Sequence, residues 1–270
     1  MKKIGFIGFG NMGSAIFDAL IESEADFSYA VCDKSEEKLK RLIMTNREMS
    51  LSLDHNEIIN MSDIVVIAIK PQGFDYFADS IDVDVSGKVF VSIMAGVGME
   101  RMQNALKTKK VVRTMPNLPA QVMSGITGVV FADDLNEDEQ NDVNQIVSAF
   151  SYPIVLKTED EINKITALSG SGPAYFFSLC QFLQEQAQEM GFSEMDARVI
   201  AEGTFIGSAR VFEAGDADAK TWAERVTSKG GTTEACLNYL KDNDFDKIFK
   251  RGIMEAKKRA DDLGKNAFYT

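Results

Sequence analysis

The chain begins with a short apolar run that leads directly into a glycine-rich turn, "GFGNMG" at residues 8–13. The turn has GxGxxG spacing, and the residues after it repeat an apolar face with helical period. In this setting Gly8 permits a tight turn, Gly10 lets a pyrophosphate reach the backbone, and Gly13 lets helix and strand pack closely. The helix N-terminus offers N–H groups and the positive end of its dipole to phosphates. The feature predicts a dinucleotide-binding βαβ unit rather than a glycine-rich turn without a ligand.

An acidic residue follows this turn at a spacing typical of dinucleotide-binding proteins. Asp33 comes directly after the second predicted strand. A carboxylate there binds the adenosine ribose hydroxyls and favours NAD, and it repels the 2′-phosphate of NADP unless a cation intervenes. Lys34 and Lys38 are candidates for that cation, or they belong to a solvated helix start. The sequence leaves the preference between NAD and NADP open.

Apolar runs alternate with amphipathic stretches through the first part of the chain. Strands are predicted at residues 4–9, 29–32, 64–69, 89–93, 111–115 and 128–131, and helices at 35–43 and 136–150. In the second of these helices Asn136 and Glu139 have the spacing of a capping box. Strands that alternate with helices predict right-handed βαβ units and a parallel, doubly wound sheet. The fold class is therefore α/β, with an N-terminal Rossmann-type sheet.

The composition changes after residue 158. The stretches 174–190 and 197–214 have apolar residues around most of the helical circumference, as in helices that pack on more than one side. No strand is predicted in this part. We therefore expect a dinucleotide-binding domain at 1–157 and an all-helical domain for substrate binding and dimerisation at 158–270.

The charge and the residue content exclude several classes of partner. The formal net charge of −12 argues against a nucleic acid or an anionic membrane surface as partner. No run approaches the roughly 18 to 20 apolar residues that a membrane span needs. His55 is the single histidine, which argues against a histidine-based metal site or catalytic triad. Three cysteines without a CxxC pair suit a reducing compartment, so a cytoplasmic protein without a metal is expected.

A glycine-rich loop precedes the helix predicted late in the chain, in "TSKGGTTEACL" at residues 227–237. We expect Gly230 and Gly231 to expose backbone N–H groups and the two threonines to add hydroxyls, which together suit a carboxylate. The residues expected to line this loop are Ser228, Lys229, Gly230, Gly231, Thr232 and Thr233. The alternative is that one threonine is a helix N-cap, worth about 1 kcal/mol, but a cap does not explain two glycines.

Three further segments admit two readings each. "IAIKPQ" at 67–72 puts a cation and a rigid turn where a buried strand ends, at the sheet edge that binds ligands, or it is a solvated strand end. "SIMAGVG" at 92–98 suits the close approach of a flat ring, or it is a simple turn. "LSGSGPAY" at 168–175 is a capped helix start, or a flexible loop beside the cofactor or a partner subunit.

In sequence order these motifs resemble the 1-pyrroline-5-carboxylate reductase family. The matching blocks span nearly the whole chain: "GFIGFGNMGSAI" (5–16), "AIKPQ" (68–72), "SIMAGV" (92–97), "VRTMPNLPA" (112–120), "ALSGSGPAYFF" (167–177) and "VTSKGGTTEACL" (226–237). The resemblance implies reduction of the C=N bond of 1-pyrroline-5-carboxylate to L-proline with NAD(P)H, the last step of proline biosynthesis. It also implies a Rossmann domain, a helical dimerisation domain, and a homodimer or a higher oligomer of dimers.

The resemblance further implies roles for individual residues. The cofactor, NADPH or NADP⁺ with NADH also allowed, would be bound by Gly8, Phe9, Gly10, Asn11, Met12, Gly13, Asp33, Lys34, His55, Ala68, Ile69, Lys70, Pro71, Ala95, Gly96, Asn117 and Glu159. The imine carboxylate would be bound by Ser228, Gly230, Gly231, Thr232 and Thr233. A threonine hydroxyl is a poor acid, so Thr233, the predicted catalytic residue, would act as a hydrogen-bond donor that positions the imine nitrogen.

The chain departs from the family pattern at three positions. Lys229 replaces a usual proline, Leu118 replaces a usual threonine, and His55 stands where an asparagine often contacts the adenosine ribose. Three other functions stay open: a β-hydroxyacid dehydrogenase, an imine reductase for another ring size, and a redox-sensing nucleotide-binding protein without turnover. The first generally needs a lysine after a glycine-rich loop, and "SGSGPAYFFSLCQFL" at 169–183 has none.

Overall fold

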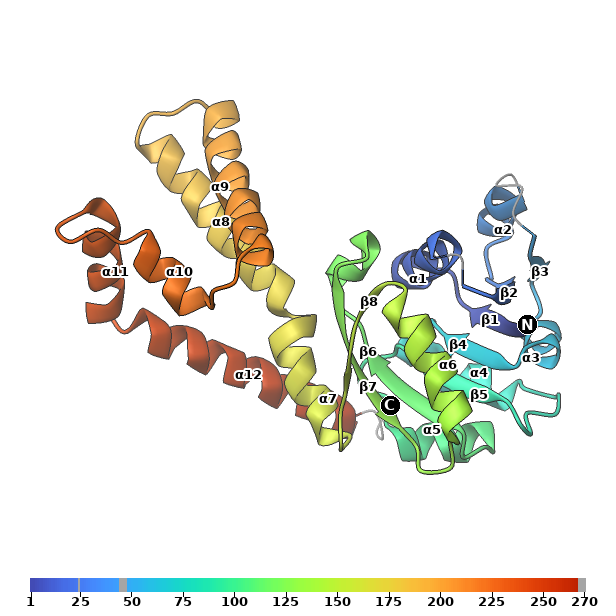
Figure 1. Cartoon of the computed structure of the whole chain (residues 1–270). Helices are drawn as coiled ribbons and strands as arrows, with labels where there is room; N and C mark the ends of the chain where they lie inside the picture. The colour runs from blue at the N-terminus through green and yellow to red at the C-terminus, as the bar shows by residue number, and fades with distance from the viewer. Residues whose placement is uncertain (24, 44–47, 267–270) are drawn as a thin grey trace. The chain divides into compact units, whose positions relative to one another are not determined.

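The computed structural model describes residues 1–23, 25–43 and 48–266, and eight strands in this part form one sheet (Figure 1). In chain order they are β1 (Lys2–Ile7), β2 (Phe27–Cys32), β3 (Ser50–Ser52), β4 (Ile64–Ile67), β5 (Val89–Ser92), β6 (Val111–Met115), β7 (Gly125–Phe131) and β8 (Ser151–Val155). Their order in space is β3-β2-β1-β4-β5-β6-β7-β8. The strand order reverses between β1 and β4, which is where open α/β sheets bind ligands at the carboxyl ends of their strands. The predicted Rossmann-type sheet is confirmed.

The sheet differs from the prediction in three respects. The strands predicted at 4–9 and 64–69 end two residues early, at Ile7 and Ile67, and β3 and β8 were not predicted. β3 has only three residues, and β8 contains Pro153, which lowers the strand propensity of its segment. The pairing of β6 with β7 is antiparallel, whereas the prediction was a parallel sheet. The connection between these two strands holds only a short 3₁₀ helix, η2 (Leu118–Val122), and a parallel pair would need a longer crossover.

Six helices cover the two faces of the sheet. Strand residues alternate between two clusters of buried side chains, as for Phe6 and Ile7. The first cluster joins the sheet to α1 (Asn11–Glu22), α2 (Glu36–Ile43) and α6 (Glu137–Ser148). The second joins it to α3 (His55–Met61), α4 (Phe74–Asp79) and α5 (Met99–Leu106). Helices on both faces bury the sheet, as a doubly wound fold requires. The predicted capping box at Asn136 and Glu139 is confirmed at the start of α6.

The chain forms two compact units, and the eight strands that the structure describes lie in the first. This unit contains Met1–Ser171 and the C-terminal segment from Lys257, and the second contains Gly172–Ala256. The first unit includes α7 (Asp160–Ile165) and a π-helical turn, η3 (Thr166–Gly170). α7 lies close on β7, since a Cβ at Gly128 would come 2.7 Å from a methyl carbon of Ile165.

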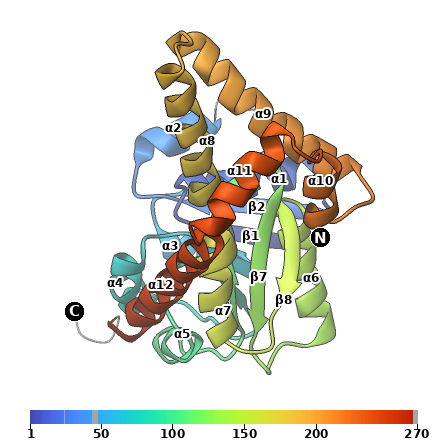
Figure 2. The ribbon, with the colours of Figure 1, turned by 90° about the vertical axis from the view of Figure 1, so that its left-hand side faces the viewer.

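The second unit contains helices only. They are α8 (Gly172–Glu189), α9 (Glu194–Ala214), α10 (Ala219–Arg225), α11 (Thr232–Asp242) and the first part of α12 (Phe245–Asn266). The predicted helices at 174–190 and 197–214 are confirmed as α8 and α9, which pack side by side (Figure 2). The structure describes no strand after Val155, as predicted for the part it covers. The domain boundary predicted between 157 and 158 coincides with the change from strands to helices. It stays a prediction. The two compact units divide at a different place, between Ser171 and Gly172.

Large apolar side chains of the second unit are exposed. On α8 and α9 the buried residues are small, such as Ala187, Ala197 and Ala201. By contrast, Phe182 is 57% exposed and Met195 is 74% exposed. Many large apolar side chains exposed on two neighbouring helices are typical of a surface that another protein covers. In the described part of the chain no helix is long and apolar enough to cross a bilayer.

Candidate functional site

The glycine-rich turn after β1 has the geometry that its spacing predicts. Gly8 has φ +92°, and a Cβ there would come 2.8 Å from the Ala68 carbonyl oxygen. A Cβ at Gly13 would come 2.9 Å from the Gly8 carbonyl oxygen, so α1 starts very close to the turn. Gly10 has no neighbour within 4 Å of its Cβ position and is the N-cap of α1 without a side-chain cap. The turn therefore leaves space and N–H donors beside Gly10, which a pyrophosphate needs.

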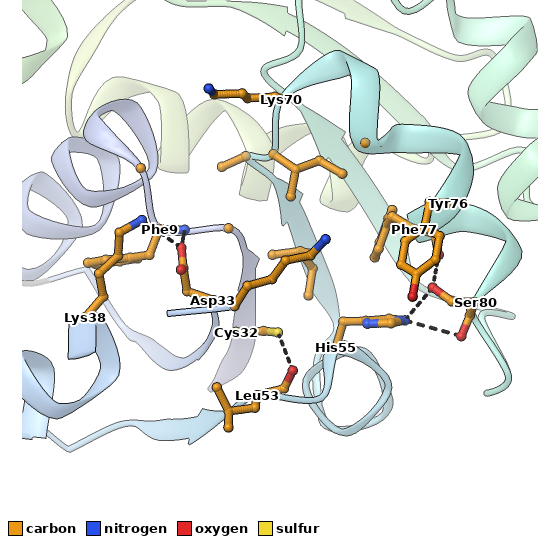
Figure 3. A pocket seen from close by; sticks show the side chains of 17 residues that line it. Phe9, Cys32, Asp33, Lys38, Leu53, His55, Lys70, Tyr76, Phe77 and Ser80 are labelled. Atoms are coloured by element: carbon orange, nitrogen blue, oxygen red, sulfur yellow. Dashed lines mark hydrogen bonds and ion pairs between the residues drawn. The ribbon is translucent and has the colours of Figure 1, made fainter. Parts of the chain in front are cut away.

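A cavity of about 550 Å³ lies in front of this turn, at the carboxyl ends of β1, β2 and β4 (Figure 3). Nine of the predicted cofactor residues line it: Gly8, Phe9, Gly10, Asp33, Lys34, His55, Ala68, Ile69 and Lys70. The sequence patterns did not indicate other residues that line it, among them Tyr76, Phe77 and Ser80. Tyr76, Phe77 and Ser80 belong to α4 and its end, and they follow the Lys-Pro step closely in sequence. The sequence did offer one indication of these three residues, because a helix that starts directly after the end of a ligand-binding strand lies close to the ligand.

The Asp33 carboxylate is already bonded on several sides. It accepts hydrogen bonds from the Phe9 N–H at 2.7 Å and the Ser35 N–H at 2.9 Å, and it pairs with the Lys38 ammonium at 3.1 Å. Burial alone would raise its pKa, but the N–H groups of Ser35 and Phe9 and the charge of Lys38 outweigh burial, so the pKa of Asp33 is lowered. Asp33 therefore fixes the glycine-rich turn to the end of β2 as an ionised group.

Two lysines belong to the lining of the cavity. Lys38 pairs with Asp33, and its side chain is 45% exposed. The Lys34 ammonium lies 5.3 Å from the ring centroid of Tyr76, a cation–π distance. Both side chains line the cavity. The charge of Asp33 is thus matched by Lys38, and Lys34 adds a second cation, which reaches Tyr76.

His55 lines the cavity on the side away from Lys38 (Figure 3). Its Nε2 atom lies 3.2 Å from the Ser80 hydroxyl and 3.3 Å from the Ser80 carbonyl oxygen. The imidazole also meets the Phe77 ring edge to face, with 5.3 Å between the centroids. His55 is the first residue of α3, where Asp54 caps the helix by accepting the Asn56 N–H. The imidazole is held in place within the cavity wall, although it stands at a helix start.

The Cys32 thiol lies in the cavity wall in an unreactive environment. Its Sγ donates to the Leu53 carbonyl oxygen at 3.6 Å. Burial, reinforced by the neighbouring charge of Asp33, raises the pKa of this thiol to about 11. Because the thiolate is the reactive form, Cys32 is a poor redox sensor at neutral pH.

Other predicted cofactor residues lie outside the lining of this cavity. Asn11 and Met12 are in the first turn of α1, and Pro71 opens η1 (Pro71–Gly73). Ala95 and Gly96 follow β5, where Gly96 has φ +75°. Their roles stay predictions.

Asn117 and Glu159 have partners within the protein. The buried Asn117 accepts the Ile126 N–H at 2.9 Å and donates to the Ser169 hydroxyl at 3.0 Å. Glu159 accepts the Met99 N–H and an Arg113 N–H, both at 2.6 Å. Asn117 thus connects the loop after β6 to β7 and η3. Glu159 accepts the N–H of Met99, the first residue of α5. The proposed contact of either residue with a cofactor stays a prediction.

The loop before α11 differs in detail from the prediction. The N-cap of α11 is Gly231, so the alternative of a threonine N-cap is wrong. The two glycine N–H groups expected to be exposed are both engaged. The Gly230 N–H donates to Glu234 Oε2 at 2.7 Å, and the Gly231 N–H donates to the Ser228 carbonyl oxygen at 3.0 Å. Thr232 and Thr233 are the first two residues of the helix, where N–H groups have no intrahelical acceptor.

Both parts of the chain match known protein families. Residues 159–263 match a family profile described as pyrroline-5-carboxylate reductase dimerisation. Residues 3–96 match a profile described as NADP oxidoreductase coenzyme F420-dependent. The two matches fall on the helical part and on the part with the glycine-rich turn.

Whole-length relatives agree with these matches. A pyrroline-5-carboxylate reductase of Staphylococcus haemolyticus (strain JCSC1435) is 31% identical over 268 residues, which cover 98% of each chain. One of Pasteurella multocida (strain Pm70) is 32% identical over 270 residues, again 98% of each. A solved structure of a pyrroline-5-carboxylate reductase from Coxiella burnetii has a TM-score of 0.88 at 30% identity, over 97% of this chain and 98% of that chain. The chain belongs to the pyrroline-5-carboxylate reductase family.

Proposed function

We propose that this chain reduces the C=N bond of 1-pyrroline-5-carboxylate to L-proline, with NADPH as the preferred reductant. The observation that carries the proposal is the presence, in a chain of this family, of two helices whose N-caps are glycines. α1 begins at Gly10 and α11 begins at Gly231, and neither N-cap supplies a side-chain acceptor. The first suits the pyrophosphate of a dinucleotide and the second suits a carboxylate.

The preference for NADPH follows from the charges around Asp33. Its carboxylate already accepts the Phe9 and Ser35 N–H groups, so its capacity for ribose hydroxyls is largely used. Lys34 and Lys38 line the same cavity, and because Asp33 pairs with Lys38, the charge of Lys34 is left without a carboxylate partner among these three groups. A 2′-phosphate gains charge-assisted hydrogen bonds from such cations, and the free hydroxyl of NADH gains less. Asp33 would hold the glycine-rich turn, and its contact with the ribose stays a prediction.

The residues before and within α11 would bind the substrate. Because both glycine N–H groups have acceptors, the substrate carboxylate would take the N–H groups of Thr232 and Thr233. The Thr233 hydroxyl would hydrogen-bond the imine nitrogen and hold it in a reactive orientation. The dinucleotide supplies the hydride, and the amine proton comes from an already protonated imine or from water through this hydroxyl.

The protein would act as a homo-oligomer in a reducing compartment. Exposed apolar side chains on α8 and α9, such as Phe182 and Met195, suit a second copy of the chain. Cys32, Cys180 and Cys236 are free thiols, which fits the cytoplasm.

The function is tested by the change in absorbance at 340 nm in a panel of reactions. NADPH and NADH are each combined with 1-pyrroline-5-carboxylate and with a cyclic imine acid of larger ring size, and a decrease in absorbance reports reduction of the imine. In a separate reaction NADP⁺ is combined with a β-hydroxyacid, whose oxidation would increase the absorbance. We expect the highest kcat/KM for the five-membered imine acid with NADPH. A higher value for the larger ring or for the hydroxyacid would reject the assignment.

The role of Thr233 is tested in the same assay. Thr233→Ala removes one donor to the imine nitrogen, which typically costs about 10² to 10³ in rate when a donor acts only in the transition state. We expect kcat/KM for the imine acid to fall at least about tenfold, while NADPH affinity stays near that of the wild type. Unchanged turnover would show that the hydroxyl does not position the substrate.

A further inference from the structure

Glu234 makes a contact within the substrate loop that the sequence pattern did not indicate. It is the third residue of α11, and its Oε2 atom accepts the Gly230 N–H at 2.7 Å. The side chain therefore reaches back past the N-cap of its own helix. A carboxylate at this place is favoured by the positive end of the helix dipole.

The contact restrains a residue with large conformational freedom. Gly230 has φ +72°, and glycine populates this and several other backbone regions about equally in the absence of restraint. The N-cap, Gly231, has no side chain that could hold the loop. The preceding residue, Lys229, stands where the family usually has proline, which would have fixed one backbone dihedral angle. The hydrogen bond to Glu234 is thus the restraint that this sequence applies next to Lys229.

The loop is closed by a second hydrogen bond. The Gly231 N–H donates to the Ser228 carbonyl oxygen at 3.0 Å. A side chain at Gly231 would collide with the Ser228 hydroxyl, so the turn from 228 to 231 is tight. With both ends of this turn fixed, the N–H groups of Thr232 and Thr233 have a defined direction.

We propose that Glu234 is a positioning residue for substrate binding, and this inference rests on the proposed function. Its carboxylate fixes Gly230 and so aims the N–H groups of Thr232 and Thr233 at the substrate carboxylate. Glu234 itself does not touch the substrate. It also occupies the Gly230 N–H, which confines substrate recognition to the first turn of α11.

The test compares two substitutions of Glu234. Glu234→Ala releases Gly230, so the loop must be ordered when the substrate binds. We expect KM for 1-pyrroline-5-carboxylate to rise about tenfold, the order of magnitude that ordering one residue's backbone costs. We expect kcat within about twofold of the wild type and an unchanged KM for NADPH. Glu234→Gln keeps an oxygen that accepts the Gly230 N–H, so it should restore KM to within about threefold of the wild type.

A matched control and a readout without turnover complete the experiment. Asp242→Ala removes an exposed acidic residue from the last turn of the same helix and should change neither KM. Amide hydrogen exchange of the peptide covering 227–233, followed by mass spectrometry, should be faster in Glu234→Ala and unchanged in Glu234→Gln and Asp242→Ala.

Several outcomes would overturn the inference. A KM for the imine acid at or below the wild-type value in Glu234→Ala would show that the contact does not aid binding. A parallel rise in KM for NADPH, or unchanged exchange of the loop, would do the same. If the wild type does not reduce the imine acid, the proposed function fails and the substrate role of Glu234 fails with it. Faster hydrogen exchange of the loop in Glu234→Ala would in that case still show that Glu234 restrains Gly230. Failure of the proposed function can therefore be told apart from failure of the contact itself.

Discussion

At Asp33 a single carboxylate joins the glycine-rich turn, the end of β2 and the start of α2. It accepts the Phe9 and Ser35 N–H groups and the Lys38 ammonium. The sequence placed an acidic residue correctly at the end of a strand. It could not show which groups surround the carboxylate, because the direction of the Phe9 N–H depends on the left-handed conformation of Gly8. The ribose-binding role of Asp33 stays a prediction, and the hydrogen bonds show a structural role beside it.

The first prediction concerns the stability that Asp33 contributes. Asp33→Ala leaves the Phe9 and Ser35 N–H groups without this acceptor, so the free energy of unfolding at pH 7 should fall by roughly 1 to 3 kcal/mol. The pKa of Asp33 is lowered in the folded state. The stabilisation is therefore complete above the ordinary carboxyl pKa of about 3.9 and is lost as the pH falls through the folded-state value.

Urea unfolding of wild type and variant, at neutral pH and at about pH 3, measures this difference. The two proteins should differ most at neutral pH and converge in acid. Asp79→Ala, at the exposed end of α4, is the control. A difference that grows in acid would contradict the account of Asp33.

The second prediction concerns the preference between cofactors. Lys34→Met removes a cation from the cavity, so the dissociation constant for NADPH should rise by about tenfold or more while that for NADH changes little. Fluorescence titration with each dinucleotide measures both constants. Lys40→Met is the control, since Lys40 pairs with Glu36 on the exposed surface of α2. Equal losses for both dinucleotides in Lys34→Met would show that Lys34 does not bind a 2′-phosphate.

At the scale of elements, the apolar runs located six of the eight strands, and helical periodicity located α2, α6, α8 and α9. Strong patterns succeed because buried strands and amphipathic helices need them. Two strands were not predicted, for different reasons. β3 (Ser50–Ser52) is too short to form a pattern, and β8 contains a proline, which lowers its strand propensity. The antiparallel orientation of β6 and β7 depends on the length of the segment that connects them rather than on the residues of the two strands. The loop before α11 was also not predictable in detail, because the residue types alone do not show which acceptors the N–H groups of Gly230 and Gly231 bind.

The third prediction separates the roles of two glycines in the turn after β1. A side chain at Gly10 meets nothing within 4 Å, whereas one at Gly13 would come 2.9 Å from the Gly8 carbonyl oxygen. Gly10→Val should therefore keep its melting temperature near the wild-type value and lose most NADPH binding, because the side chain occupies the space for the pyrophosphate. Gly13→Val should lower the melting temperature by several degrees. Normal NADPH binding in a folded Gly10→Val would contradict the placement of the pyrophosphate.

At the scale of the whole molecule, the two compact units have different surface chemistry. The first has large apolar side chains packed in the two clusters on either side of the sheet, and it also exposes some, such as Tyr76 and Tyr152. The second buries small residues between α8 and α9 and exposes large ones. A chain with such a surface gains stability when that surface is covered by another copy. The sequence predicted that this surface pairs with another copy, because apolar residues surround most of the circumference of both helices.

The fourth prediction concerns this surface. The wild type should sediment as a dimer or a larger oligomer at micromolar concentration. Phe182→Glu puts a charge on the exposed apolar face of α8 and should shift the protein toward the monomer, because an unpaired charge in an interface is costly. Gln188→Glu, at another exposed position of the same helix, adds the same charge and is the control. A monomeric wild type, or an unchanged oligomer in Phe182→Glu, would show that this face is not the interface.

The most direct test of the central claim follows the hydride itself. The protein is incubated with 1-pyrroline-5-carboxylate and NADPH that carries two deuterium atoms at the nicotinamide C4, and the product is examined by mass spectrometry. If the chain reduces the C=N bond with hydride from the dinucleotide, proline will form with one deuterium at the former imine carbon. Oxidation of NADPH without labelled proline, or no oxidation at all in the presence of the imine acid, would contradict the account.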